Sequence, residues 1–131
     1  MTANYEKKRP ACNNTYSKGM DAEEKVSYYL ENMGFKILDR NFAVYMAGEI
    51  DIIAKRGNTL FFVEVKYRKN NNTFDISNGC ICAGKLRKLK KCADIYLQKN
   101  KTNNYYCKFI GAMVQKTGFG KIPKINTIYL D

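Results

Sequence analysis

Residues 48–66 read GEIDIIAKRGNTLFFVEVK, and this stretch decides the fold. Two runs rich in β-branched and aromatic residues flank Gly57-Asn58, which is a typical two-residue hairpin turn. A turn of even length fixes which residues of the two strands face each other. The pairs that it predicts are Arg56 with Thr59, Ile53 with Phe62, Asp51 with Glu64 and Glu49 with Lys66.

Acidic residues lie on one face of this predicted hairpin. Successive strand residues point to opposite faces, so Glu49 and Asp51 share a face, as do Glu64 and Lys66. Directly opposed carboxylates destabilise a sheet by up to ~1 kcal/mol, and a divalent cation held by oxygen ligands removes that repulsion. The pattern therefore predicts a metal site. The alternative is a solvated hairpin end, in which an ion pair between Glu49 and Lys66 contributes little.

Both faces of the hairpin contain apolar residues, which favours a central strand pair covered by helices on both sides. Ile53 and Phe62 make the acidic face apolar near the turn. The opposite face is predicted to hold Ile50, Ile52, Ala54, Phe61, Val63 and Val65.

The remaining elements are read from hydrophobic periodicity. We expect a first helix from Met20 to Met33, ended by Gly34, with Ala22, Val26, Tyr29, Leu30 and Met33 at helical spacing. Further expected elements are a strand from Phe35 to Val44, a helix from Ala83 to Gln98, a strand from Tyr105 to Val114 and a candidate strand from Ile122 to Leu130.

This order predicts the α/β class, with a mixed sheet flanked by helices in the order α-β-β-β-α-β. A chain of 131 residues fits one domain, which we place at residues 19–131. Residues 1–18 are basic and polar, and we expect a flexible N-terminal segment there.

The composition favours a polyanionic partner. Twenty-three Lys and Arg residues against 12 acids give a formal net charge of +11. This surplus of positive charge favours nucleic acid, most of all DNA, as the partner. The alternative is that a general compositional bias toward Lys and Asn produces the charge without any role in binding. The chain has no histidine, which excludes histidine bases and histidine-metal nuclease centres.

Other patterns bear on location. The sequence has no uncharged apolar run of about 18 residues and no apolar stretch in residues 1–18, which predicts a cytoplasmic protein without a membrane partner. Its five cysteines form no C-x-x-C pair, which favours reduced thiols over a disulfide framework or a zinc ribbon.

Charged residues outside the hairpin supply further candidates. Glu23 lies at the edge of the buried stripe of the first helix, either as a site residue or as an ordinary first-turn acid. Arg68 begins a basic, Asn-rich loop over residues 68–72. The outer face of the second helix is a solvated face or a phosphate-binding ridge, and it holds Lys85, Arg87, Lys88, Lys90 and Lys91.

Five short motifs resemble the YraN-type family of predicted endonucleases over about residues 17–115. That family is similar to Holliday-junction resolvases of the PD-(D/E)xK superfamily, with a restriction-endonuclease-like or tRNA-endonuclease-like fold. One departure is Tyr67, where the family usually has Thr after the motif lysine. The motifs are Gly19-x-x-Ala22-Glu23, Arg40-Asn41-Phe42, Gly48-Glu49-Ile50-Asp51, Phe62-Val63-Glu64-Val65-Lys66-x-Arg68 and Lys85 leading into Ala93-x-x-Tyr96-Leu97.

The resemblance implies roles for these residues. Asp51 and Glu64 would hold Mg²⁺ or Mn²⁺, and Lys66 would orient or help to deprotonate the attacking water. Glu23 would complete the acid cluster and Glu49 would support it from further out. Lys85 would meet a phosphate, with Lys88, Lys91 and Arg68 as further nucleic-acid contacts.

Two functions are therefore open at this stage. The first is a metal-dependent endonuclease with DNA as the favoured substrate, and the sequence leaves open whether that substrate is branched or structured DNA, duplex or single-stranded DNA, or RNA. The alternative is a non-catalytic nucleic-acid-binding module that retains the nuclease fold. The sequence also leaves a homodimer open.

Overall fold

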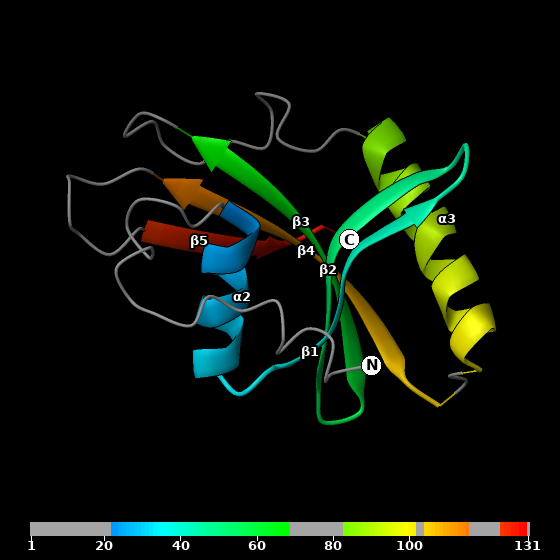
Figure 1. The fold of residues 1–131 in the computed structure, drawn as a ribbon, viewed down its shortest axis with the longest axis horizontal. Helices are drawn as coiled ribbons and strands as arrows, with labels where there is room; N and C mark the ends of the chain where they lie inside the picture. The colour runs from blue at the N-terminus through cyan, green and yellow to red at the C-terminus, as the bar shows by residue number, and fades with distance from the viewer. Residues whose placement is uncertain (1–21, 69–82, 102–103, 116–123, 131) are drawn as a thin grey trace.

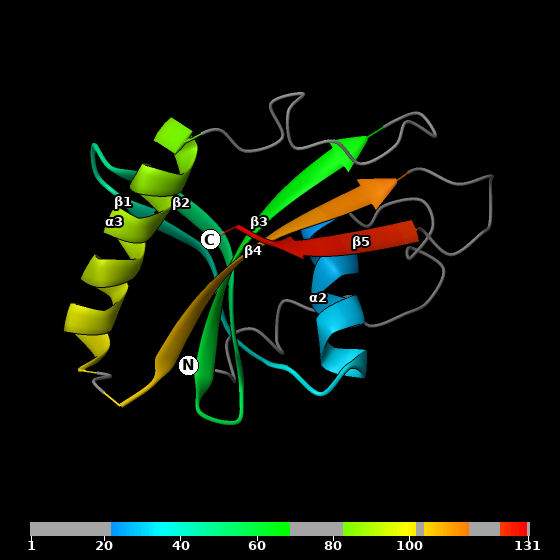
Figure 2. The same cartoon turned by 180° about the vertical axis from the view of Figure 1, so that it is seen from behind.

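The computed structural model describes residues 22–68, 83–101, 104–115 and 124–130. It contains one five-stranded mixed sheet in the order β1-β2-β3-β4-β5, with α2 on one face and α3 on the other (Figures 1 and 2). The expected α/β class is confirmed, and the arrangement is consistent with a restriction-endonuclease-like fold. The elements are α2 (Ala22–Asn32), β1 (Lys36–Val44), β2 (Gly48–Arg56), β3 (Thr59–Arg68), α3 (Ala83–Asn100), β4 (Tyr106–Gln115) and β5 (Lys124–Tyr129).

The helix α2 ends where the sequence predicts. Gly34 has a φ of 91°, and the amides of Gly34 and Phe35 donate to the carbonyls of Glu31 and Leu30 at 3.1 and 3.0 Å. Only glycine adopts this left-handed conformation at no steric cost, so it closes the helix. Met33, which the periodicity places on the buried stripe, is instead 49% exposed. The expected start at Met20 and the N-terminal segment 1–18 lie outside the described residues.

The two helices cover two separate hydrophobic cores. On the α2 side, buried side chains of the helix and the sheet pack together, led by Val26, Leu30, Ile52, Ala54, Phe61 and Val63. On the α3 side, the buried cluster includes Ile50, Ile53, Leu60, Phe62, Leu89, Cys92, Ala93 and Tyr96. The sheet is thus buried on both faces, as the apolar composition of both faces of the hairpin predicts.

The predicted register of the β2–β3 hairpin is confirmed near its turn. Arg56 faces Thr59 and Ile53 faces Phe62, and the parallel pairing of β3 with β4 continues to Arg68. The β2–β3 ladder, however, ends at Ile52 and Val63. The predicted pairs of Asp51 with Glu64 and of Glu49 with Lys66 are therefore wrong, because the two strands separate at this point.

The separation is accompanied by a bend in β1 and β2. Ile52 packs in the α2-side core, whereas Ile50 packs in the α3-side core, so the predicted face is wrong for Ile50. Regular alternation would keep both on one face. In β1, Arg40 pairs with Ile52 and Phe42 pairs with Ile50, and Asn41 lies between them. The φ of Asn41 is 53°, which breaks the extended conformation of the strand. Beyond it, β1 and β2 curve toward α3, away from β3 (Figures 1 and 2).

The other elements agree with the sequence to within a few residues. The helix α3 runs two residues further than predicted, to Asn100, and the candidate last strand is present as β5, next to β4. None of the helices in the described ranges has both the length and the apolar character that a membrane crossing requires.

We expect Phe62→Ala to lower the free energy of unfolding by about 3–5 kcal/mol, because it leaves a cavity in the α3-side core. Phe62 is fully buried, and its ring lies 5.4 Å from that of Phe109 and 6.1 Å from that of Tyr96. Urea denaturation measures the loss. As the control, Tyr106→Ala changes a side chain that is 70% exposed and should shift stability by no more than about 0.5 kcal/mol. Equal losses would contradict this assignment of the core.

Candidate functional site

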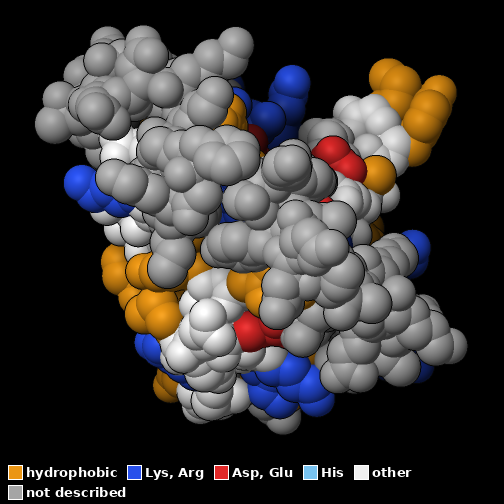
Figure 3. Space-filling view, turned by 60° about the vertical axis from the view of Figure 1, so that its left-hand side comes forward, with side chains coloured by type: hydrophobic (Ala, Val, Ile, Leu, Met, Phe, Trp, Pro, Cys, Tyr) orange, Lys and Arg blue, Asp and Glu red, His pale blue; other side chains and the backbone are white. Residues whose placement is uncertain are grey.

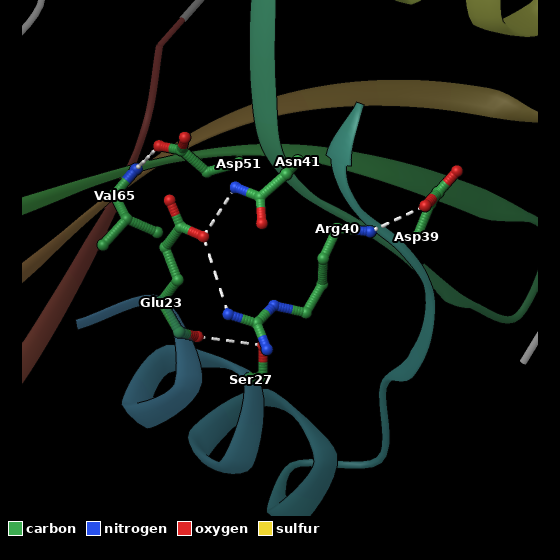
Figure 4. A network of polar contacts seen from close by, with 7 residues as sticks. All are labelled: Glu23, Ser27, Asp39, Arg40, Asn41, Asp51 and Val65. Atoms are coloured by element: carbon green, nitrogen blue, oxygen red, sulfur yellow. Dashed lines mark hydrogen bonds and ion pairs between the residues drawn. The ribbon is translucent and has the colours of Figure 1, made fainter. Parts of the chain in front are cut away.

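Asp51 lies in the gap that opens between β2 and β3. Its Oδ2 accepts a hydrogen bond of 2.8 Å from the backbone amide of Val65 (Figure 4). This amide lies beyond the last paired residues of the β2–β3 ladder, so a side chain replaces the missing backbone acceptor. The same bond fixes the orientation of the Asp51 carboxyl.

Glu23 approaches Asp51 from the first turn of α2. Its Oε1 accepts a hydrogen bond of 2.7 Å from Nδ2 of Asn41 and lies 3.5 Å from Nη2 of Arg40. Figure 4 shows the Glu23 carboxyl pointing from the helix toward Asn41 and Asp51. The acid on the inner edge of α2 is therefore held by two side chains of β1, and its role goes beyond a favourable position in the helix dipole.

Arg40 and Asn41 have a role at the site that the sequence patterns alone do not assign. Both are in the middle of β1, where Asn is disfavoured in a regular strand. Asn tolerates the left-handed conformation better than most residues, and Asn41 adopts it. The polar run Asp39-Arg40-Asn41 in the middle of a strand was therefore the available signal for a bend next to the site.

The pKa of Asp51 is raised from its ordinary 3.8 to about 7, chiefly because burial disfavours the charged carboxylate. The charges of Glu64 and Glu23 and a hydrogen bond between the Asp51 and Glu23 side chains contribute to this rise, whereas the hydrogen bond from the amide of Val65 opposes it. Three carboxyl groups thus interact across the gap between the strands. Without a cation, the cluster holds a proton near neutral pH.

Glu64 enters the cluster from β3. Its side chain is 5% exposed, and its Oε2 lies 3.2 Å from Nζ of Lys85, a residue of the first turn of α3 whose side chain is 44% exposed. Lys85 therefore contacts the acid cluster directly in this structure. Lys66 is half-buried two residues after Glu64, and the alternation of β3 directs it to the same face.

The remaining predicted residues lie further out. Glu49 is exposed on the bent section of β2. Its charge is not among those that raise the pKa of Asp51, which are the charges of Glu64 and Glu23. Lys88 and Lys91 are exposed on α3. Arg68 is the last residue of β3, and its side chain lies outside the described part of the structure.

The acid cluster fits a hard divalent cation in its donor type. Among the described residues, no three His, Cys, Asp or Glu side chains lie close enough together to enclose a metal ion. Mg²⁺ does not require such an enclosure, because it keeps several waters and uses one or two carboxylates. The bonds to Val65 and Lys85 use Oδ2 of Asp51 and Oε2 of Glu64, and the carboxylate oxygens of these two residues are the ligand type that a hard cation takes.

We expect the metal-free protein to lose stability as the pH rises from about 4 to about 7, because the folded state alone keeps the proton on Asp51 in this range. Relative to the Asp51→Asn variant in EDTA, the loss should be about 1–2 kcal/mol, reduced from the full shift because the carboxyl is partly exposed. Asn can still accept the bond from Val65. Urea denaturation at a series of pH values measures the free energy of unfolding of both proteins. If the two free energies change with pH in parallel, Asp51 is ionised throughout this range and the expectation is wrong.

Comparison with known proteins identifies relatives over most of the chain. A family model described as "Uncharacterised protein family UPF0102" matches residues 22–114. A UPF0102 protein of Caldicellulosiruptor saccharolyticus is 39% identical over 110 residues, which cover 84% of this chain and 92% of the relative. One of Hahella chejuensis is 36% identical over 108 residues, or 80% and 86% of the two chains. One of Aliarcobacter butzleri is 40% identical over 89 residues, or 68% and 78%.

Proposed function

The chain belongs to the UPF0102 family, the YraN-type family that its motifs resemble, and from this premise we propose that it is a metal-dependent endonuclease that cleaves DNA. The observation that carries the proposal is the meeting of Glu23, Asp51 and Glu64 at the opening between β2 and β3. The charges of Glu23 and Glu64 raise the pKa of Asp51, and a shared cation would stabilise the carboxylates. The half-buried Lys66 on the same strand as Glu64 supplies a positive charge beside them.

In this proposal Asp51 and Glu64 hold Mg²⁺ or Mn²⁺. The cation would polarise the scissile phosphate and acidify the attacking water. The Val65 amide and the Asn41 side chain keep Asp51 and Glu23 in position, so little reorganisation is needed at the moment of reaction. Lys66 donates its charge where negative charge develops on the phosphate, and it helps to orient or deprotonate the water.

The nucleic acid would lie along α3. Lys85 joins this helix to the acid cluster, and Lys88 and Lys91 continue the basic surface away from it. A formal net charge of +11 supports a polyanionic substrate, and we propose DNA with a branched or otherwise structured form.

One observation favours a second candidate, a binding module without turnover. In the absence of a cation the acids already have internal partners, because Lys85 pairs with Glu64 and Asp51 holds a proton near neutral pH. A cluster neutralised in this way could serve a purely structural purpose. Mutation of Lys66 distinguishes the two candidates.

Lys66→Ala should reduce Mg²⁺- or Mn²⁺-dependent cleavage by about a hundredfold or more, because it removes a preorganised charge from the transition state. Metal binding and DNA affinity should change little. A matched control is Lys55→Ala, a half-buried lysine at the other end of the sheet, over the ring of Tyr105. Cleavage would be assayed on branched, flapped, duplex and single-stranded DNA and on RNA. If wild type cuts none of them, or if Lys66→Ala cuts as well as wild type, the binding module is the better description.

Lys88→Ala and Lys91→Ala should weaken DNA binding to a similar extent on all sequences. Each variant removes one positive charge from the phosphate path, so the slope of log K against log salt should flatten by about one unit for each lysine replaced. Fluorescence anisotropy at several salt concentrations measures the slope, and cleavage should persist at saturating protein. An unchanged slope in both variants would mean that the DNA does not follow α3.

A further inference from the structure

The turn between β1 and β2 carries two exposed apolar side chains in sequence. Tyr45 is 92% exposed and Met46 is 86% exposed, more than any other large hydrophobic residue in the described ranges. In Figure 3, hydrophobic side chains stand clear of the surface at one corner of the molecule, close to acidic side chains. Two adjacent large apolar residues with this exposure mark a surface that meets a partner.

The backbone of this turn is strained at Met46. The amide of Ala47 donates to the carbonyl of Val44 at 3.0 Å, and Met46 has a φ of 62°. This is the third position of a type II turn, where Gly or Asn is favoured. Met at this position contributes no packing to the core and strains the backbone, so it is a poor choice for stability alone.

The turn is nevertheless held firmly. Val44 and Ala47, on either side of the exposed pair, pack against the α3-side core. The backbone of Gly48 approaches α3 so closely that a Cβ there would lie 3.7 Å from Sγ of Cys92 and 3.9 Å from Cβ of Lys88. Tyr45 and Met46 therefore project from a support that rests on the basic helix.

The surroundings of the turn favour nucleic acid as the partner. The helix beneath it exposes Lys85, Arg87, Lys88 and Lys91, a surface suited to phosphates. Proteins that hold nucleic acid on such a surface often insert an apolar side chain between bases or stack an aromatic ring on them. A nucleic acid would use both the basic charges and the exposed apolar pair, whereas an apolar protein surface would use only the pair.

We propose that Tyr45 and Met46 form a wedge that stacks on or between the bases of a nucleic acid held along α3. This rests on the nucleic-acid partner of the proposed function and adds an interaction with bases. Met46 is five residues from Asp51, and because the turn and the bend in β2 shorten the path, the two residues lie no further apart than about 17 Å, the length of five extended residues and of roughly five base-pair steps. The wedge would therefore favour a substrate with an unpaired or weakly stacked base within this distance of the cleaved phosphate, where insertion costs least.

The chain has no tryptophan, so Tyr45→Trp introduces a single fluorescent reporter at the wedge. In EDTA, which prevents cleavage, we expect DNA with an unpaired base to quench this indole strongly and a fully paired duplex to quench it less. Heparin, a polyanion without bases, should leave the fluorescence nearly unchanged. The control Tyr106→Trp places the same reporter at another exposed tyrosine and should respond to none of the three.

A second pair of variants tests the cost of removing the wedge. Tyr45→Ala should weaken binding to DNA with an unpaired base by about fivefold or more, the lower end of what an aromatic stacking interaction contributes. Met46→Gly should bind more weakly as well, yet melt no lower than wild type, because glycine relieves the strained φ. Tyr106→Ala should change neither affinity nor preference.

The inference is wrong if no nucleic acid quenches the Tyr45→Trp indole, if heparin quenches it equally, or if its emission depends on protein concentration alone, which would indicate a second copy of the chain. These readouts do not require turnover. Quenching without cleavage in Mg²⁺ or Mn²⁺ would support the wedge and overturn the endonuclease. If the protein cleaves DNA while the fluorescence of the Tyr45→Trp indole is unaffected by DNA, the endonuclease is supported and the wedge is overturned.

Discussion

The hydrogen bond from the Val65 amide to Asp51 is the interaction on which the rest of the site depends. Where β2 leaves β3, the backbone amide of Val65 loses its usual partner, and a buried amide without an acceptor is costly. Asp51 supplies the acceptor and is thereby drawn into the opening between the strands. The arrangement brings a carboxylate into the middle of a sheet that is otherwise buried on both faces.

The opening allows groups from both sides of the sheet to meet. Glu23 comes from the α2 side, whereas Glu64 and Lys85 meet on the α3 side, and Asp51 lies between them. Burial makes each negative charge harder to solvate, and this explains why Asp51 retains a proton to about pH 7. The same burial strengthens the interaction of these groups with any cation that replaces the proton. A region that is unfavourable for carboxylates alone is thus suited to a metal.

Local sequence rules predict the parts of the fold that local forces determine. Gly57-Asn58 fixes the hairpin register as far as Ile52, and the apolar spacing of α3 predicts its buried side. The end of the ladder could not be predicted, because the pairing rules assume regular strands. The change of face at Ile50 depends on the bend at Asn41 and on packing against α3, which are tertiary effects. The identities of the acids were readable from the motif, whereas the partners of Glu23 required the structure.

The bend that opens the site also determines where the exposed turn lies. Asn41 takes the left-handed conformation that redirects β1, and its side chain holds Glu23. Beyond the bend, Val44, Ala47 and the backbone of Gly48 rest on α3. Because one short, supported hairpin end connects the acid cluster to Tyr45 and Met46, their separation is set by strand geometry. A flexible loop would leave that distance variable, so, if the chain cleaves nucleic acid as proposed, this fold would hold a base contact and the cleaved phosphate at a fixed spacing.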